Sequence, residues 1–426
     1  MTTECYKEIT RTRRKMKKNF AIWLTIVLVV TLSIVACAPA AQEVSSKTLK
    51  WGVCLPLTGV NAGYGVPTLA AIQVEVAKIN SEGGVKIGGV NYQIEVIAED
   101  NGFTSDGAKT AGEKLVFRDK VKFIWGGTES NDTLGLQLVT VPNKVMTFNT
   151  AWADTVLRDP ATKQAIPYSF KVLQAPHETL RGVWGSIQKA YPEIHRVALF
   201  TPNTLSGHYG QELSAKLAPY LGYEVVYNDY FEFGTPDFTS YLSKILATNP
   251  DIIHGSATGL ADWGSIIKQS REMGYQGYFM YELALGGDLL FSVATKEAAE
   301  GFIGLDFPWH GPNTVPELKD FRDKYVAAAG FWFPELCNLP IAAECLVQAI
   351  QTAGSIDDTD KITQILETST FNVMGQSVQF AGKEYYGANR VLAVPLTVAV
   401  IKGGELVPIG AISVAEQVSP WPPGLD

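Results

Sequence analysis

Cysteine is scarce in this sequence, with five residues in 426. Downstream of Cys37 the chain holds Cys54, Cys337 and Cys345, an odd number without paired spacing. Cys337 and Cys345 lie eight positions apart. On one helix this spacing is a rise of about 12 Å, too far for a disulfide bond. We therefore expect no disulfide, and we predict that Cys54, which lies in an apolar stretch, is a buried thiol.

The chain also lacks the patterns of metal sites and of common hydrolases. Its five histidines are scattered without ligand spacing: His177, His195, His208, His254 and His310. No GxSxG, HExxH or GKS/GKT pattern is present. The glycines of GGVKIGG indicate a turn rather than a phosphate loop. Sequence neighbours such as Ser206 and His208 rarely form a catalytic pair. The sequence thus predicts no metal, no cofactor and no enzymatic activity.

The N-terminus has the features of a bacterial lipoprotein precursor. Lys17 and Lys18 precede an apolar run, residues 20–35, and the run ends in Ile-Val-Ala before Cys37. Its length, about 16 residues, is short of the roughly 20 that a spanning helix needs, although a spanning anchor is the alternative. We predict a signal peptide over residues 1–36, with Met16 as the suspected true start. Cleavage before Cys37 would leave that cysteine to carry a diacylglycerol.

A surplus of basic residues is absent from the predicted mature chain. The first 36 residues hold seven of the 35 basic and two of the 43 acidic residues, which leaves a net charge of −13. Such a chain has no electrostatic basis for binding nucleic acid. Residues 37–47 are small and polar and predict a flexible tether. Its lipid would hold the chain on the cell membrane, facing the periplasm or the cell exterior.

Short apolar strands alternate with amphipathic helices beyond the tether. Strands are expected at residues 49–57, 92–98, 121–125, 196–200, 224–230 and 252–255. Helices are expected from Pro67 onward and at residues 105–118, 209–221, 237–248 and 261–273. This alternation predicts an α/β fold of two doubly wound lobes with parallel sheets. Ligands of such sheets bind beyond the carboxyl ends of the strands, here in the cleft between the lobes.

The order and spacing of several segments resemble the branched-chain amino acid type of periplasmic binding protein, the receptor of an ABC importer. These segments are LPLTG, AKINSEGGV, IEVIAEDN, YGQEL, TPDFTSYLSKILATNPDII and AAEGFIG, within residues 47–405. The resemblance implies two lobes joined by a three-crossing hinge that closes over a small ligand. The crossings are expected near residues 171–174, 301–306 and 374–383. Lobe 1 then comprises residues 48–170 with 306–380, and lobe 2 comprises residues 171–305 with 381–426.

The resemblance also implies where a ligand would bind. In relatives that bind amino acids, a serine and backbone N–H groups hold the carboxylate where the third strand meets a helix. Ser130 is the matching residue, and a helix N-terminus favours an anion. The alternative is that Ser130, Asn131 or Asp132 only caps the helix. The carboxylates of Glu129 and Asp132 would weaken any anion site there.

The next contacts of the family follow its fourth strand, where this chain has Ala151, Trp152 and Ala153. Ala153 stands where the family has a threonine, so one expected hydroxyl is missing. Trp152 adds a large flat surface that either stacks on a planar ligand or packs against its own lobe.

Two residues of the second lobe complete the expected site. Tyr209 matches a tyrosine that closes over the ligand, with packing at the helix N-terminus as the alternative. Glu282 matches, within one residue, an acid that pairs with an α-ammonium group, with a solvated loop acid as the alternative. The partial match makes a plain leucine or valine receptor doubtful. It leaves another amino acid, an amide or urea-like molecule, or an aromatic acid.

The sequence thus predicts a monomeric, lipid-anchored receptor that delivers a small solute to the permease subunits of an ABC importer. A sensor or envelope-assembly partner on the same fold is the main alternative, because fold alone does not determine function. A lipid-anchored enzyme is the remaining one.

Overall fold

The computed structural model describes residues 46–425, apart from residues 60, 175, 233, 286–287, 307–314, 337 and 418. The predicted signal peptide, Cys37 and most of the predicted tether lie outside the described residues. Ser46 and Lys47, expected to end the tether, are instead the first residues of a strand that pairs with Asn91 and Tyr92. Among the described helices, none combines the length and the apolarity that a membrane span requires.

The first sheet is built on a parallel core with antiparallel strands at its edges. In spatial order its strands are β12 (Thr370–Val373), β13 (Gln376–Ala381), β14 (Val391–Ala393), β6 (Ser169–Lys171), β5 (Met146–Asn149), β4 (Phe123–Gly126), β1 (Ser46–Leu55), β3 (Val90–Asp100) and β2 (Val85–Ile87). A row of aromatic rings crosses its centre from Trp51 through Trp125, Phe148 and Phe170 to Phe380, with ring centroids 4.7–5.6 Å apart. These strands therefore have a common apolar core.

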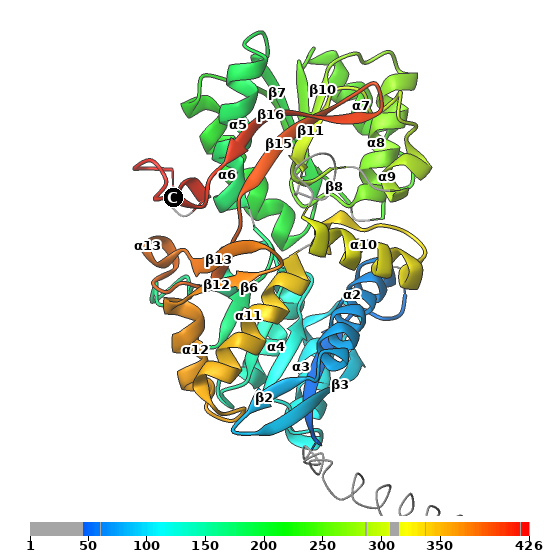
Figure 1. Cartoon of the computed structure of the whole chain (residues 1–426). Coiled ribbons are helices and arrows are strands. Elements are labelled where there is room, and N and C mark those ends of the chain that lie inside the picture. Colours follow the sequence, from blue (N-terminus) through cyan, green and yellow to red (C-terminus); the bar gives the residue numbers. More distant parts are fainter. Residues whose placement is uncertain are drawn as a thin grey trace, which may run out of the picture. The chain divides into compact units, whose positions relative to one another are not determined.

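The second sheet follows the same plan with five parallel strands and an antiparallel pair at one edge. Its strands are, in spatial order, β16 (Glu405–Ile412), β15 (Leu396–Lys402), β11 (Phe302–Asp306), β10 (Tyr278–Ala284), β9 (Ile252–His254), β7 (Arg196–Pro202) and β8 (Glu224–Phe231). The long ribbon of β15 and β16 beside β11 can be followed in Figure 1.

Helices connect the parallel strands, as the sequence pattern predicts. Those of the first lobe are α2 (Ala62–Ser81), α3 (Ser105–Glu113), α4 (Ser130–Thr140), α10 (Pro316–Ala329), α11 (Asn338–Ala353), α12 (Thr359–Thr368) and α13 (Lys383–Tyr386). Those of the second lobe are α5 (Pro176–Ala190), α6 (Leu205–Tyr220), α7 (Thr239–Ala247), α8 (Leu260–Glu272), α9 (Asp288–Val293) and α14 (Val414–Gln417). The fold class is therefore the expected one, with two doubly wound α/β lobes.

Helix α2 differs from the sequence-based expectation in its start. It begins at Ala62, more than one helical turn before Pro67, which was expected to be its first residue. The missing N–H of Pro67 therefore falls inside the helix rather than at its first position.

Three crossings join the two lobes (Figure 1). The first lies between β6 and α5, near the expected residues 171–174. The second follows β11, so the expected residues 301–306 are mostly a strand of the second sheet rather than the crossing itself. The third crossing lies between β14 and β15, later than the expected residues 374–383. Residues 381–393, assigned to lobe 2 from the sequence, therefore belong to the first sheet and its loops. The apolar run from Val391 onward resembles one strand, but Pro395 lacks an N–H and divides it between two sheets.

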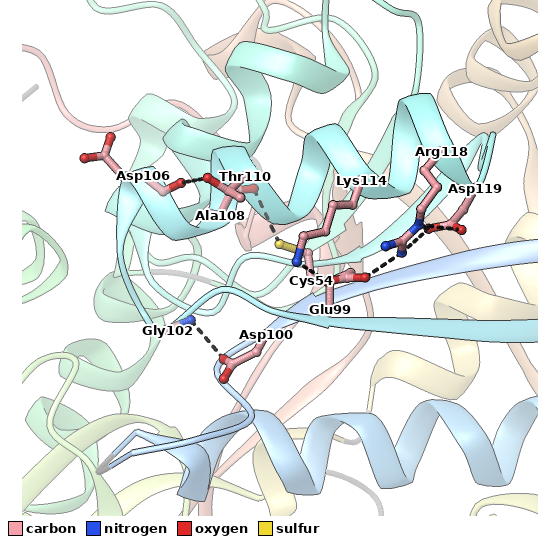
Figure 2. Close-up of polar contacts among 10 residues, drawn as sticks. All are labelled: Cys54, Glu99, Asp100, Gly102, Asp106, Ala108, Thr110, Lys114, Arg118 and Asp119. Carbon is pink, nitrogen blue, oxygen red and sulfur yellow. Dashed lines mark hydrogen bonds and ion pairs between the residues drawn. The ribbon is translucent and has the colours of Figure 1, made fainter.

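Polar contacts of Glu99 and Asp100 at the end of β3 hold neighbouring segments of the first lobe (Figure 2). Glu99 binds Lys114 at 2.9 Å and Arg118 at 2.6 Å, which ties β3 to the π-helical turn Lys114–Arg118 that follows α3. Asp100 accepts hydrogen bonds of 2.9 Å from the N–H groups of Gly102 and Leu57. Asp100 thereby joins the loops that follow β1 and β3.

The cysteine predictions agree with the structure where it describes them. Cys54 and Cys345 are free, buried thiols. The sulfur of Cys54 lies 3.9 Å from the carbonyl oxygen of Ala108. A dashed line marks this contact in Figure 2. Burial raises the pKa of both thiols, so they stay protonated. Cys337 lies outside the described residues.

Candidate functional site

A cavity of about 100 Å³ lies between the two lobes. Most of its lining residues stand at or just beyond the carboxyl ends of parallel strands, where α/β sheets bind their ligands. An engineered cavity of about 150 Å³ holds a benzene molecule, so a cavity of this order suits a small solute.

The lining combines an apolar wall with a row of polar groups. The aromatic members are Tyr64, Phe103, Trp152, Tyr281 and Phe333, and the aliphatic members are Leu173, Pro202, Ala257, Leu283 and Leu336. The polar members are Thr68, Thr128, Glu129, Thr150, Thr204 and Ser206. Such a mixture gives a solute apolar contact area and a few hydrogen bonds that fix its orientation.

The N-terminus of α4, where Ser130 was predicted to bind a carboxylate, has Glu129 as its cap. The Glu129 carboxylate accepts a hydrogen bond from the N–H of Asn131, and Asp132 accepts one from the N–H of Glu129. This reciprocal pair forms a capping box. The cap is thus Glu129, one residue before the three considered from the sequence. Burial and then the nearby Glu129 raise the pKa of Asp132 to about 7.

Ser130 itself is fully buried and is not among the residues that line the cavity. Its hydroxyl oxygen accepts a hydrogen bond of 3.0 Å from the N–H of Ala153 and lies 3.1 Å from the hydroxyl of Ser206. Ser130 and Ala153, both predicted to contact a ligand, are therefore close together. In the described structure they bond to each other.

Glu129 also reaches the second lobe. One of its carboxylate oxygens accepts hydrogen bonds from the N–H of Ser206 at 3.1 Å and from its hydroxyl at 2.6 Å. Ser206 lies in the first turn of α6, whose N-cap is Thr204. Hydrogen bonds to a charged group are worth about 1.5–3 kcal/mol each, so these contacts favour the closed arrangement of the lobes.

Trp152 forms a second bridge between the lobes. It lines the cavity, and its indole N–H donates a hydrogen bond of 3.0 Å to the hydroxyl of Ser256. Ser256 in turn donates to the carboxylate of Glu282. Trp152 is thus held by a contact with the other lobe rather than only with its own, and its predicted stacking on a planar ligand stays a prediction.

Glu282 is neither in a loop nor solvated. It lies in β10, is fully buried and is not among the residues that line the cavity. Burial raises its pKa to about 7. His254, with its Nδ1 3.7 Å from Glu282, has its pKa lowered to about 4 by burial and is therefore neutral.

Ala151 and Tyr209 lie apart from this cavity. Ala151 packs in a small apolar cluster with Val156 and Tyr386. Tyr209 lines a separate cavity of about 370 Å³, together with Asp154 and Arg158 among others. The binding roles predicted for Ser130, Ala151, Trp152, Ala153, Tyr209 and Glu282 stay predictions.

Several lining residues were not identified from the sequence, although a general signal was available. Phe103 and Thr150 stand in the loops after β3 and β5, and Tyr64 stands in the first turn of α2, which follows the loop after β1. An aromatic or hydroxyl residue in such a loop is a candidate by position alone. Phe333 had no such signal, because it precedes a short turn far along the chain, Pro334–Leu336.

No group of three or more His, Cys, Asp or Glu side chains among the described residues is arranged to hold a metal ion.

Comparison with known proteins gives consistent matches. The model of a family described as periplasmic binding protein matches residues 48–405. The Leu/Ile/Val-binding protein homolog 2 of Brucella abortus (strain 2308) is 22% identical over 336 residues, which cover 78% of this chain and 86% of the relative. The Leu/Ile/Val-binding protein homolog 1 of Brucella suis is 24% identical and covers 76% and 83%.

Solved structures share the fold at similar levels of identity. The leucine binding protein LivK of Thermotoga maritima has a TM-score of 0.68 and 22% identity, and the match covers 86% of this chain and 99% of that protein. A solute binding protein of an ABC transporter from Rhodopseudomonas palustris BisB5, in complex with 3,4-dihydroxybenzoic acid, has a TM-score of 0.71 and 19% identity, with coverage of 86% and 98%.

Closure of the cavity can be tested at Gly259, the N-cap of α8. A Cβ there would lie 2.2 Å from the hydroxyl oxygen of Tyr64 in the other lobe. The backbone at Gly259 is extended, with φ −61° and ψ 149°, so a side chain causes no backbone strain. We expect Gly259→Val to weaken solute binding roughly tenfold, because overpacking costs about 1–3 kcal/mol in the closed state. Gly185→Val is the matched control, since nothing lies within 4 Å of a Cβ there. Equal affinities of the two variants would contradict this closure.

The burial of Glu282 predicts how the stability of the protein changes with pH. Its pKa is raised from 4.5 to about 7 in the folded state, so between these values the folded state binds more protons than the unfolded state. Glu282 therefore makes stability fall as pH rises from about 4.5 to 7. We expect the unfolding free energy of Glu282→Gln, relative to wild type, to rise by about 1–3 kcal/mol over this range in urea titrations. The exposed Glu272→Gln is the control, and a difference that is flat with pH would refute the assignment.

Proposed function

Because the chain belongs to the periplasmic binding protein family, we propose that it is the extracytoplasmic solute-binding receptor of an ABC importer. It traps a small solute in the cavity between its lobes and delivers it to the permease. The cavity itself is the main support for this proposal. Its lining comes from both lobes, and hydrogen bonds beside it join one lobe to the other.

The chemistry of the solute follows from the lining. Five aromatic rings and five aliphatic residues offer contact to an apolar or planar body, and six polar residues offer hydrogen bonds to a small head group. An amino-acid-like, amide or aromatic-acid solute fits this description. The solved relatives support this range, since one is described as a leucine binding protein and another as a complex with 3,4-dihydroxybenzoic acid.

Among the residues predicted from the sequence, we assign direct contact with the solute to Trp152. Ser130, Ala153 and Glu282 act behind the cavity wall, because they hold the loop after β5 and Ser256 in place. The receptor performs no chemical step on its solute. It uses the difference in affinity between its open and closed states, which is what couples binding to transport.

The lipid on Cys37 keeps the monomeric receptor at the outer face of the cell membrane. A tether that ends before Ser46 leaves the first residues of β1 to pair with β3. Confinement near the membrane raises the effective concentration of the receptor at its permease.

A solute screen tests the receptor function. The chain from Ala38 onward is screened by thermal shift against amino acids, amides and aromatic acids. A true solute at 100 times its Kd should stabilise the protein by about 2.7 kcal/mol. Phe103→Ala, which removes one aromatic ring of the lining, should weaken the binding of that solute. Tyr220→Ala, on the exposed end of α6, should leave it unchanged. The proposal fails if no solute of a broad panel shifts melting.

The anchor is tested with Cys37→Ala in the expressing cell. Without the acyl acceptor, the protein should move from the membrane fraction to the soluble extracytoplasmic fraction. Mass spectrometry of the wild-type N-terminal peptide should show diacylglycerol on Cys37. Retention of the variant in the membrane would favour the spanning anchor instead.

A further inference from the structure

Glu129 differs in charge from the other residues that line the cavity. It is the only charged side chain among the described residues that line the cavity, and neither lysine nor arginine is present there. Any head group that enters the polar side of the cavity therefore meets one fixed negative charge and no positive side chain.

The Glu129 carboxylate lies where two helix N-termini converge. Its Oε2 accepts a hydrogen bond of 2.5 Å from the N–H of Asn131 in the first turn of α4. Its Oε1 accepts hydrogen bonds of 3.1 Å and 2.6 Å from the N–H and hydroxyl of Ser206 in the first turn of α6. Both helix dipoles direct their positive ends toward this place, which makes it a favourable position for an anion.

The carboxylate of Glu129 thus occupies the place where the two helix N-termini would bind an anion. A solute carboxylate cannot use the N–H groups of Asn131 and Ser206 while Glu129 accepts from them. A carboxylate placed beside Glu129 is also repelled at short range, in a cavity whose apolar walls screen charge poorly. A neutral amide or a cation experiences no such repulsion, and the aromatic walls are compatible with a cation.

We propose that Glu129 determines specificity by excluding solutes whose carboxylate would enter this end of the cavity, so that the receptor takes a small apolar solute with an amide, amidine or amine head group. This inference rests on the proposed receptor function and narrows its range of solutes. It also explains the capping box. Asp132, buried beneath, accepts from the N–H of Glu129 and keeps the cap in place.

A purely structural role for Glu129 makes a different prediction. If its bonds to Ser206 only hold the lobes together, their loss would weaken the binding of every solute by the same factor. Specificity changes the ratio of affinities between solutes that differ in charge alone. The ratio is therefore the decisive measurement.

The test uses two sets of probes that keep shape and vary charge. Benzoate, benzamide and benzamidinium share one planar shape with charges of −1, 0 and +1. 4-Methylpentanoate, its amide and the corresponding primary amine form a branched aliphatic set. Each probe is titrated calorimetrically at pH 7.5 into the chain from Ala38 onward, as wild type, Glu129→Gln and Glu129→Ser. Serine is a favoured N-cap, so the second variant preserves α4. The exposed Glu113→Gln is the control.

We expect wild type to bind the amide or the cation of at least one set at least tenfold more tightly than the acid. In both Glu129 variants the affinity for the acid relative to the amide should rise at least tenfold, while Glu113→Gln should leave it unchanged. The inference is overturned if wild type binds an acid as tightly as its amide, or if the variants change all probes by one factor. Absence of binding by every probe to every variant, with no hit in the wider solute screen, would instead remove the receptor function on which the inference rests.

Discussion

One carboxylate serves two helices, one in each lobe, and helps to hold the lobes together. Glu129 caps α4 in its own lobe and accepts the N–H and hydroxyl of Ser206 at the start of α6 in the other. A cap is a local requirement of the first helix, whereas the contact with Ser206 exists only when the lobes meet. Two helix N-termini brought together without an anion would leave N–H donors unpaired and their dipoles opposed. The same side chain therefore links local folding, closure and the charge of the cavity.

The fold was largely predictable because its signals are local and repeated. Strands such as Arg196–Pro202 and helices such as α8 have the expected period and nearly the expected bounds. The exceptions have physical causes. Helix α2 begins before Pro67, which the helix tolerates in its interior. The third crossing lies later than expected because β14 has three residues, Val391–Ala393, and merges in sequence with the apolar run of β15. A strand so short carries little periodicity, and only its pairing with β6 assigns it to a sheet.

The site was less predictable because its contacts join distant residues. The loops after β4 and β5, where the family resemblance implied a ligand, do line the cavity, and the sequence raised Glu129 as an obstacle to anion binding. It could not show that this carboxylate accepts from Ser206, 77 positions away, or that Trp152 donates to Ser256, 104 positions away. Nor does local pattern separate Glu282 in a strand from an acid in a loop. A residue's type suggests what it can bind, but the packing of two lobes determines which groups are already bound to each other.

The three crossings have a consequence for how the protein is made. Lys171 in β6 pairs with Val391 in β14, and Gln174 donates a hydrogen bond to the carbonyl of Leu392 across 218 positions. The first sheet therefore cannot be completed until almost the entire chain has left the ribosome. Long-range pairing of this kind folds slowly. The same topology that joins the lobes by three crossings therefore makes completion of the first sheet a late step of folding.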